Sequence, residues 1–407
     1  MSSVNLDIGL FTYSTKPRGG VVHTLNLAEH LADQDQNPHV YALGRRDESA
    51  FFRDVSVPTT IVPFEKRDDE SFTQRVQRYI SRFTEFLAGG GLHEHDLYHS
   101  QDCISANALW NLRQESRIPF FVRTIHHVDD FKTQALVDCQ DNSITRPDRR
   151  IVVSNYWKGK LHEDFGVSAS VIPNGVDLNQ FRPAPDTDSI KTYKGEFDLS
   201  STTVYLSLSG VEPRKNTKTM LRAFEKIVEA SRDSRSNPVW VIAGGKTLFD
   251  YRDYREDFYG MLEESELQKG EDVRILGSVS DDELLKLYQL ADVLLFPSRK
   301  EGFGLVALEA MACDLPVVAS TIDVFQEFMT DGENALLVDP DSPLELKEAA
   351  IRLTEEGDLR EKIIDQGRET AEEYSWENTA RRHVNFYRDV LNHMERLKEP
   401  FGEPDQL

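Results

Sequence analysis

The sequence predicts an α/β protein with two domains, each built around a parallel sheet. Three observations lead to this prediction. Short apolar stretches alternate with helical periodicity along the whole chain. A length of 407 residues exceeds what a single hydrophobic core usually organises. A polar, proline-rich segment at 181–189 interrupts the alternation, which then starts again, so the domain boundary is expected near 185–200.

In the first half of the chain, the apolar stretches predict seven strands. These are expected near 4–13, 39–43, 59–63, 96–99, 119–125, 150–153 and 170–172. Helical periodicity predicts helices near 21–33, 71–88, 104–114 and 156–165. We therefore expect a first domain over residues 1–187.

In the second half, the same pattern predicts six strands. These are expected near 203–208, 238–243, 272–276, 292–296, 316–319 and 335–338. Helices are expected near 216–230, 281–290, 304–313, 342–356 and 358–374, and an amphipathic helix from about 376 to 397 closes the chain. The second domain is expected over residues 195–374.

The charge balance limits the classes of partner. The chain has 47 Lys and Arg against 70 Asp and Glu, a formal net charge of −23. Phosphate backbones require a cationic surface, so we predict no nucleic-acid partner. The charge is uneven, because residues 1–185 contain 20 basic and 24 acidic side chains and the remainder contains 27 and 46.

The cysteines and the apolar runs bear on the cellular compartment. Cys103, Cys139 and Cys313 are scattered without metal-ligand spacing, which predicts reduced thiols. The N-terminus reads as a strand and lacks the basic segment of a leader. No apolar run approaches the ~20 residues that span a bilayer. We expect a soluble, cytoplasmic protein.

The segment with the most specific chemistry is 297–310, Pro-Ser-Arg-Lys-Glu-Gly-Phe-Gly-Leu-Val-Ala-Leu-Glu-Ala, which follows an apolar strand and opens a helix. Ligands of open α/β sheets bind at the carboxyl ends of strands. A glycine-containing turn and a helix N-terminus favour an anion, which makes the backbone amides of Phe303, Gly304, Leu305 and Val306 candidates for a diphosphate. Glutamates at 301 and 309 could then hold two sugars of one extended ligand, the transferred sugar and a ribose respectively.

This segment resembles the Glu-x7-Glu signature of family 4 glycosyltransferases, retaining enzymes with two Rossmann-like domains facing each other across a cleft (GT-B). Similarity extends over nearly the whole chain. The matching segments are 16–25 with Gly19 and Gly20, 124–126 with His126, 153–158, 171–177, and 210–216 with Arg214 and Lys215. Their combination in this order is highly specific.

The resemblance implies roles for these residues. The catalytic set is His126, Glu301 and Lys215, in which His126 meets a sugar hydroxyl and Lys215 the donor diphosphate. Gly19 and Gly20 would approach the donor, although a flexible helix entry is the competing interpretation. The base would lie near Gly277. The final helix, residues 375–400, would cross back to the first domain, which binds the acceptor.

One departure from the family pattern concerns the phosphate site. The family usually has Gly-Arg at the end of the first strand of the second domain, and here the matching residues are Ser209 and Gly210. The arginine is therefore missing, and Arg214 is a candidate to replace its charge.

Cations of the chain can neutralise the leaving diphosphate. We therefore expect a metal-independent enzyme with no cofactor besides the nucleotide-sugar co-substrate.

Two further segments carry alternatives. His126 and His127 end a strand, and alternation sends them to opposite faces, so only one of them is expected to reach the cleft. Asp129 and Asp130 after them could contact the acceptor or cap a helix. On the 71–88 helix, arginines at 75, 78 and 82 share one face. That face could make a weak contact with an anionic membrane or a lipid-linked acceptor, or it could simply be solvated.

The sequence thus predicts a retaining, nucleotide-sugar dependent hexosyltransferase acting on a sugar or lipid-linked acceptor. The first alternative is a non-catalytic nucleotide-sugar-binding protein of the same fold. A dehydrogenase would need Gly-x-Gly-x-x-Gly after a strand, and neither Gly19-Gly20 nor Gly244-Gly245 belongs to such a motif. A glycan phosphorylase would need a lysine for pyridoxal phosphate, and Lys246 is the candidate.

Overall fold

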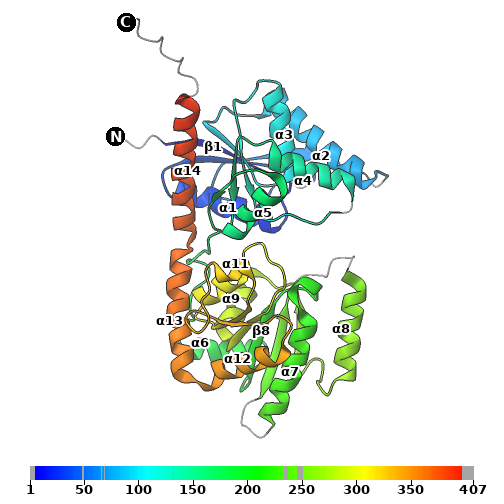
Figure 1. Ribbon diagram of the computed structural model, residues 1–407, viewed down its shortest axis with the longest axis vertical. Coiled ribbons are helices and arrows are strands. Elements are labelled where there is room, and N and C mark those ends of the chain that lie inside the picture. The colour runs from blue at the N-terminus through cyan, green and yellow to red at the C-terminus, as the bar shows by residue number, and fades with distance from the viewer. Residues whose placement is uncertain are drawn as a thin grey trace, which may run out of the picture. The chain divides into compact units, whose positions relative to one another are not determined.

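The computed structural model describes residues 5–47, 50–65, 67, 69–131, 133–232, 237–244 and 251–396. Figure 1 shows the chain as alternating strands and helices. The chain forms two compact units, one of residues 1–174 with 376–407 and the other of residues 175–375. The α/β fold class with two parallel sheets is confirmed, and each of the thirteen expected strands is present.

The first unit is built on a seven-stranded parallel sheet with the order β3-β2-β1-β4-β5-β6-β7. Its strands are β1 (Asp7–Thr12), β2 (Asn37–Arg45), β3 (Thr59–Phe64), β4 (Leu97–Ser100), β5 (Val122–Ile125), β6 (Arg149–Val152) and β7 (Ser170–Val171). In the central strand β1, Leu10 is in register with Val40 of β2 and with His99 of β4. Helices cover both faces of this sheet, so its central strands β1, β4 and β5 are almost entirely buried, including the polar residues His99, Ser100, Arg123 and Thr124.

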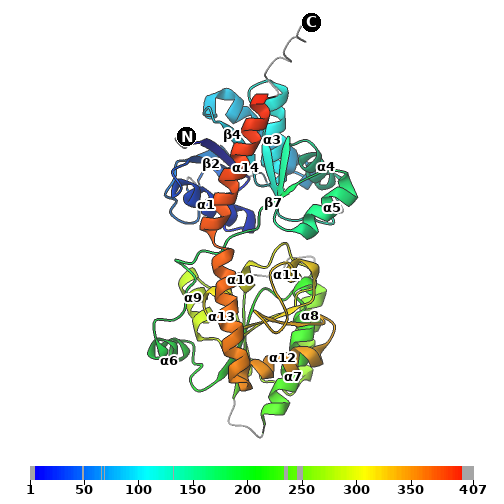
Figure 2. The ribbon, with the colours of Figure 1, turned by 60° about the vertical axis from the view of Figure 1, so that its left-hand side comes forward.

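Side-chain alternation assigns the two faces of this sheet. Ile8 and Leu10 pack in one core with α1 (Gly19–Ala32) and α14 (Trp376–Arg396). Phe11 and Tyr41 pack in the opposite core with α2 (Phe72–Phe86) and α3 (Cys103–Gln114). The remaining elements of the unit are η1 (Leu87–Gly91), α4 (Gln134–Thr145) and α5 (Asn155–Phe165). Figure 2 shows α14 beside α1.

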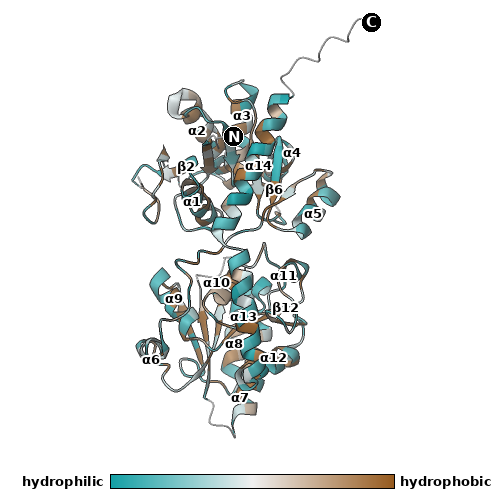
Figure 3. Cartoon of the chain, turned by 90° about the vertical axis from the view of Figure 1, so that its left-hand side faces the viewer, coloured by the Kyte–Doolittle hydropathy of each residue, from teal (hydrophilic) through white to brown (hydrophobic). Residues whose placement is uncertain are grey.

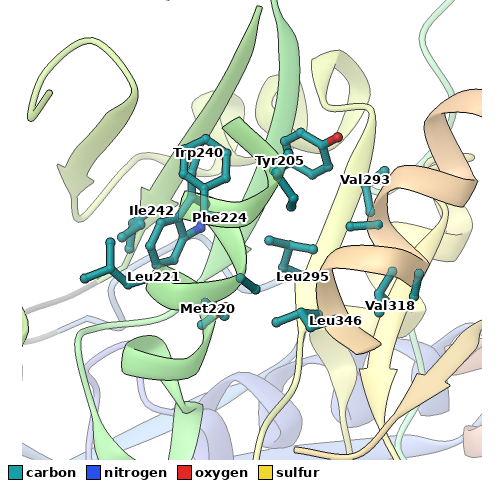
Figure 4. Close-up of a cluster of buried hydrophobic side chains, with 14 of the residues drawn as sticks. Tyr205, Met220, Leu221, Phe224, Trp240, Ile242, Val293, Leu295, Val318 and Leu346 are labelled. Carbon is teal, nitrogen blue, oxygen red and sulfur yellow. The ribbon is translucent and has the colours of Figure 1, made fainter. Parts of the chain in front are cut away.

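The second unit contains a six-stranded parallel sheet with the order β10-β9-β8-β11-β12-β13. Its strands are β8 (Thr203–Leu208), β9 (Pro238–Ala243), β10 (Val273–Gly277), β11 (Val293–Phe296), β12 (Val317–Ser320) and β13 (Leu336–Val338). Its helices are α6 (Thr187–Glu196), η2 (Pro213–Lys215), α7 (Thr217–Ser231), α8 (Arg252–Glu264), α9 (Asp281–Leu290), α10 (Leu305–Ala312), α11 (Asp323–Gln326), α12 (Pro343–Glu355) and α13 (Gly357–Glu373). Figure 4 shows its core, in which Trp240 and Phe224 pack beside Leu221.

The last helix is amphipathic, as its periodicity predicts. Val384, Tyr387 and Val390 are buried in the core that α14 shares with α1 and the sheet of the first unit. The face of α14 visible in Figure 3 is largely hydrophilic. Among the described residues, no helix combines the length and the apolar character that a membrane crossing requires.

Two segments differ from the sequence-based expectation. Residues 187–196, expected within or beside a linker, form helix α6, because the Asp186 side chain caps it by accepting a hydrogen bond from the backbone N–H of Ser189 at 2.8 Å. Residues 175–187, assigned above to the first domain, belong to the second unit. Val176 donates its backbone N–H to the carbonyl of Tyr374, and Gln289 donates to the carbonyl of Arg182.

Candidate functional site

The turn between β11 and α10 brings backbone amides to the carboxyl end of the second sheet. Gly304 has φ +118°, and a Cβ added there would lie 2.8 Å from the ring of Phe325, so glycine is required. Helix α10 begins at the next residue. Within the described chain, the amides of Phe303, Gly304, Leu305 and Val306 donate no hydrogen bond. Four donors and a helix N-terminus are therefore available to an anion.

Lys215 lies beside this turn. Lys215 lies in η2, which follows β8, and β8 is the neighbour of β11 in the sheet. The segments that follow these two strands therefore meet at one edge of the sheet. The Lys215 ammonium donates to Oε1 of Glu301 at 2.5 Å, and the hydroxyl of Ser298 donates to the same oxygen at 2.8 Å. The ammonium also lies 5.0 Å from the centre of the Phe296 ring.

The burial of Lys215 affects its charge. The residue is 8% exposed, and this burial lowers its pKa, whereas Glu301 acts in the opposite direction. A partly desolvated ammonium interacts more strongly with an anion than one in water. The structure therefore holds a cation in a low-dielectric position next to free backbone donors.

Arg214 adds a second cation to the same carboxylate. Its Nη1 lies 3.5 Å from Oε2 of Glu301, and its Nε lies 3.0 Å from Oε2 of Glu212. The Arg214 side chain is 44% exposed and so remains accessible to a ligand. The family usually has an arginine at the position of Gly210. In this chain, Arg214 carries a positive charge four residues later, on the loop that follows β8.

A network that the sequence analysis missed fixes the two loops. The Asn216 side chain donates to the carbonyl of Pro297 at 3.1 Å, and Arg299 donates through Nε to Oδ1 of Asn216 at 3.2 Å. The backbone N–H of Arg299 donates to the carbonyl of Arg214 at 2.8 Å. Asn216 has φ +62°, a conformation that Asn tolerates better than most residues. An Asn directly after a Pro-Arg-Lys turn was the available signal.

Glu309 also has a partner that the sequence analysis missed. The hydroxyl of Tyr288, from α9, donates to Oε2 of Glu309 at 2.5 Å. Burial raises the pKa of Glu309, and the hydrogen bond from Tyr288 counteracts part of that shift. The carboxylate of Glu309 is therefore oriented before a ligand arrives.

Gly277 ends β10 with φ +76°, and its carbonyl accepts a hydrogen bond from Gly244 at 2.7 Å. The strands β10, β9, β8 and β11 are parallel and adjacent in this order. Gly277, at the end of β10, therefore lies at the same edge of the sheet as Glu301, which follows β11. The expectation for Lys246 falls outside the described residues. Among the described residues, no group of three or more His, Cys, Asp or Glu has the arrangement to hold a metal ion.

The first unit contains the remaining predicted site residues. Gly19 and Gly20 form the first turn of α1. His126 follows β5, and its Nε2 is buried without a hydrogen-bond partner among the described residues. Its ring lies 4.6 Å from that of His23 in an edge-to-face arrangement, and burial lowers its pKa to about 3. His127 is instead exposed and pairs with Asp129 at 3.2 Å.

Comparison with known families identifies the two halves of the chain. Residues 17–180 match the model described as "Glycosyltransferase Family 4", and residues 191–370 match that of "Glycosyl transferases group 1". The chain belongs to the family 4 glycosyltransferases.

Curated relatives of this glycosyltransferase align along its length. The D-inositol 3-phosphate glycosyltransferase of Corynebacterium urealyticum is 26% identical over 396 residues, 92% of each chain. The enzyme of the same name from Thermobifida fusca is 28% identical over 75% of this chain and 72% of its own.

Solved structures share the fold of this glycosyltransferase. Sucrose-phosphate synthase from Thermosynechococcus elongatus superposes with a TM-score of 0.77 at 21% identity, over 95% of this chain and 99% of its own. Anabaena HepE, solved with UDP and glucose, gives 0.74 at 18% identity, over 95% and 100%. The GT-B fold expected from the sequence is confirmed.

Proposed function

We propose that this glycosyltransferase transfers a hexose from a nucleotide-diphosphate sugar to a hydroxyl of an acceptor, with retention of anomeric configuration and without a metal. The observation that supports this most is the convergence of Lys215, Glu301 and the free amides of residues 303–306 at one edge of the second sheet. HepE has been solved with UDP and with UDP-glucose, which favours a uridine donor as the first to test.

The donor would be held in three parts. Lys215 and the amides of residues 303–306 bind the diphosphate, and Arg214 supplies the charge that the family has at the position of Gly210. Glu301 accepts hydrogen bonds from hydroxyls of the transferred sugar. Glu309, oriented by Tyr288, binds the ribose, and the base lies near Gly277.

The chemistry follows from where charge develops. As the glycosidic bond breaks, negative charge grows on the leaving diphosphate, and preorganised donors that meet this charge lower the barrier. The acceptor hydroxyl attacks from the face that the diphosphate leaves, and its proton passes to a diphosphate oxygen. The configuration at the anomeric carbon is thereby retained. In the first unit, His126 has a free buried nitrogen, for which we propose a hydrogen bond to a sugar hydroxyl.

The second candidate is a protein that binds the nucleotide sugar without transferring it. The replacement of Gly-Arg by Ser209-Gly210 favours it, because an arginine contact to the diphosphate is lost. Turnover that depends on Glu301 separates the two candidates.

The experiment is a donor screen followed by a turnover assay. UDP-, GDP- and ADP-glucose are tested for a rise in melting temperature, since a ligand at a hundredfold excess over its Kd adds about 2.7 kcal/mol. The stabilising donor is then incubated with sugar and sugar-phosphate acceptors, and NMR reads the anomeric configuration of the product. We expect a retained product with wild type and none with Glu301→Gln. Tight donor binding without turnover on any acceptor would favour the binding protein, and inversion would exclude the proposed mechanism.

A further inference from the structure

A cavity of about 300 Å³ lies in the first unit, at the loop that precedes Gly19 and Gly20. It opens where the parallel strands β1, β2 and β3 end, which is the edge at which α/β sheets bind ligands. Its wall is formed by the loop after β1, the end of β2, the residues Phe64, Arg67 and Glu70, and one side of α2. The lining residues are Tyr13, Ser14, Thr15, Lys16, Arg18, Leu43, Gly44, Arg45, Phe64, Arg67, Glu70, Arg75, Arg78 and Tyr79.

The wall of this cavity is basic, although the protein as a whole is acidic. Six of its residues are Lys or Arg and one is acidic, whereas the chain as a whole has a net charge of −23. The cations come from four separate segments of the sequence, so helix or loop composition alone does not account for their meeting. A wall in which cations outnumber acids favours an anionic ligand.

The single acid of the wall, Glu70, is already paired. Arg78 donates to both of its oxygens, through Nε at 2.7 Å and Nη2 at 2.5 Å, and Arg75 donates at 3.2 Å. These arginines lower the pKa of Glu70 to about 2. Arg78 also donates to the carbonyl of Glu65 at 2.9 Å and lies over the Phe64 ring. Arg78 with Glu70 is therefore a fixed, neutral part of the wall.

Five further cations line the cavity together with this pair. Besides Arg78 they are Lys16, Arg18, Arg45, Arg67 and Arg75, the last sharing Glu70 with Arg78. Hydroxyl groups of Tyr13, Ser14 and Thr15 line the same cavity. Burial raises the pKa of Tyr13, so its phenol stays protonated and can donate or accept. Cations together with hydroxyl groups fit an anion attached to a polyol.

We propose that this cavity binds a phosphate group of the acceptor, an inference that rests on the function proposed above and names the acceptor class. A phosphate dianion matches several guanidinium groups, and each oxygen can accept charge-assisted hydrogen bonds from them. The basic face of the 71–88 helix then has a specific role, because Arg75 and Arg78 line the cavity and Arg82 donates to the carbonyl of Pro63. The phosphate belongs either to a soluble sugar or polyol phosphate or to a phospholipid headgroup.

Calorimetric titration of the full chain tests this proposal. The probes are glucose 6-phosphate, an inositol monophosphate, their unphosphorylated counterparts, and phosphatidylcholine vesicles with and without phosphatidylinositol. The test variant is Arg18→Gln combined with Arg75→Gln. The matched control is Arg46→Gln, an arginine that is next in sequence to Arg45, lies outside the cavity wall and has a 77% exposed side chain.

We expect at least one phosphorylated probe to bind wild type, and its unphosphorylated counterpart to bind at least about tenfold more weakly. The double variant should lose roughly tenfold or more in affinity, while Arg46→Gln should stay within about twofold of wild type. Binding confined to phosphatidylinositol vesicles and lost in the double variant identifies a lipid headgroup as the phosphate. Failure of every phosphate probe to bind, or equal binding by the double variant, overturns the proposal.

UDP titrated into the same proteins separates this proposal from the proposed function. UDP affinity is expected to be equal in wild type and the double variant. If the double variant loses UDP as well as the phosphate probe, these arginines serve the donor and the acceptor assignment is overturned. If wild type binds a sugar phosphate in the cavity but no nucleoside diphosphate, the cavity proposal stands and the donor assignment fails.

Discussion

The ammonium of Lys215 lies 2.5 Å from Oε1 of Glu301, although 86 residues separate them in the sequence. The parallel sheet produces this contact, because β8 and β11 are neighbours and both residues follow the carboxyl ends of their strands. The ion pair leaves the other Glu301 oxygen facing Arg214. A buried pair of this kind is costly to assemble, which is consistent with a binding role rather than a purely stabilising one.

Lys215→Ala should reduce kcat/KM for the donor by roughly 100- to 1000-fold, because a positioned cation no longer meets the charge of the leaving diphosphate. Steady-state kinetics measures this loss. Lys218→Ala is the control, since Lys218 is three residues away but pairs with Asp257 at 2.7 Å; it should retain activity within about threefold. Similar losses in both variants would count against a specific role for Lys215.

The Tyr288–Glu309 hydrogen bond makes a prediction about pH. Burial raises the pKa of Glu309 and Tyr288 lowers it again, so Tyr288→Phe should raise the pKa further. Glu309 must be ionised to accept from ribose hydroxyls, so the acid limb of the kcat/KM profile should move to higher pH. Tyr259→Phe, a tyrosine on α8, should leave the profile unchanged. An unmoved limb in Tyr288→Phe would show that Glu309 does not control donor capture.

Four histidines, at positions 23, 99, 126 and 383, make the stability of the first unit depend on pH. Burial lowers the pKa of each, to about 4 for His383 and about 3 for His126. These histidines are neutral in the folded protein and bind protons more readily in the unfolded chain. Their effect on the free energy of unfolding is therefore absent above pH ~6.5, where both states are deprotonated. The free energy of unfolding falls as the pH drops below that value, by about 1.4 kcal/mol per pH unit for each histidine.

Urea unfolding between pH 7.5 and 5 measures this dependence. His383→Asn should make the slope shallower by about one histidine's share, whereas His127→Asn, whose side chain is 51% exposed, should leave it unchanged. Stability that is flat over this range would contradict the buried, neutral state of the cluster.

The core of the second unit predicts a large effect at Trp240. Its side chain is fully buried between the rings of Phe224 and Phe258, and its indole N–H donates to Ser207 at 3.0 Å. Trp240→Ala should lower the free energy of unfolding by about 3–5 kcal/mol. Leu344→Ala, at a 52% exposed position, should change it by about 0.5 kcal/mol or less. Chemical denaturation compares the two variants.

Much of this architecture could be predicted from local sequence. Apolar runs predicted the strands. The glycine at position 304 indicated the turn between β11 and α10, and the structure shows why glycine is needed there, since its φ is +118°. Helix α6 was missed because its capping residue, Asp186, stands in a proline-rich stretch that reads as a linker. The pairing of Tyr288 with Glu309 joins side chains of two different helices, α9 and α10, and periodicity does not reveal such a contact.

Contacts between polar side chains that are far apart in the sequence were the least predictable feature of the structure. His99 accepts or donates a hydrogen bond at 2.7 Å with Tyr387, 288 residues later. Arginines of the phosphate cavity come from four segments, and only those on the 71–88 helix show a pattern in the sequence. Their assembly depends on the order of β1, β2 and β3 in the sheet.

The most direct test of the donor site is a binding cycle with UDP and UMP on wild type and Lys215→Ala, measured by calorimetry, with ADP and GDP pairs as substitutes if uridine is not the base. The two nucleotides differ by the phosphate that Lys215 and the α10 amides are proposed to hold. Wild type should bind UDP at least about tenfold more tightly than UMP, and Lys215→Ala should lose most of that preference. An undiminished preference for UDP in Lys215→Ala would contradict the account.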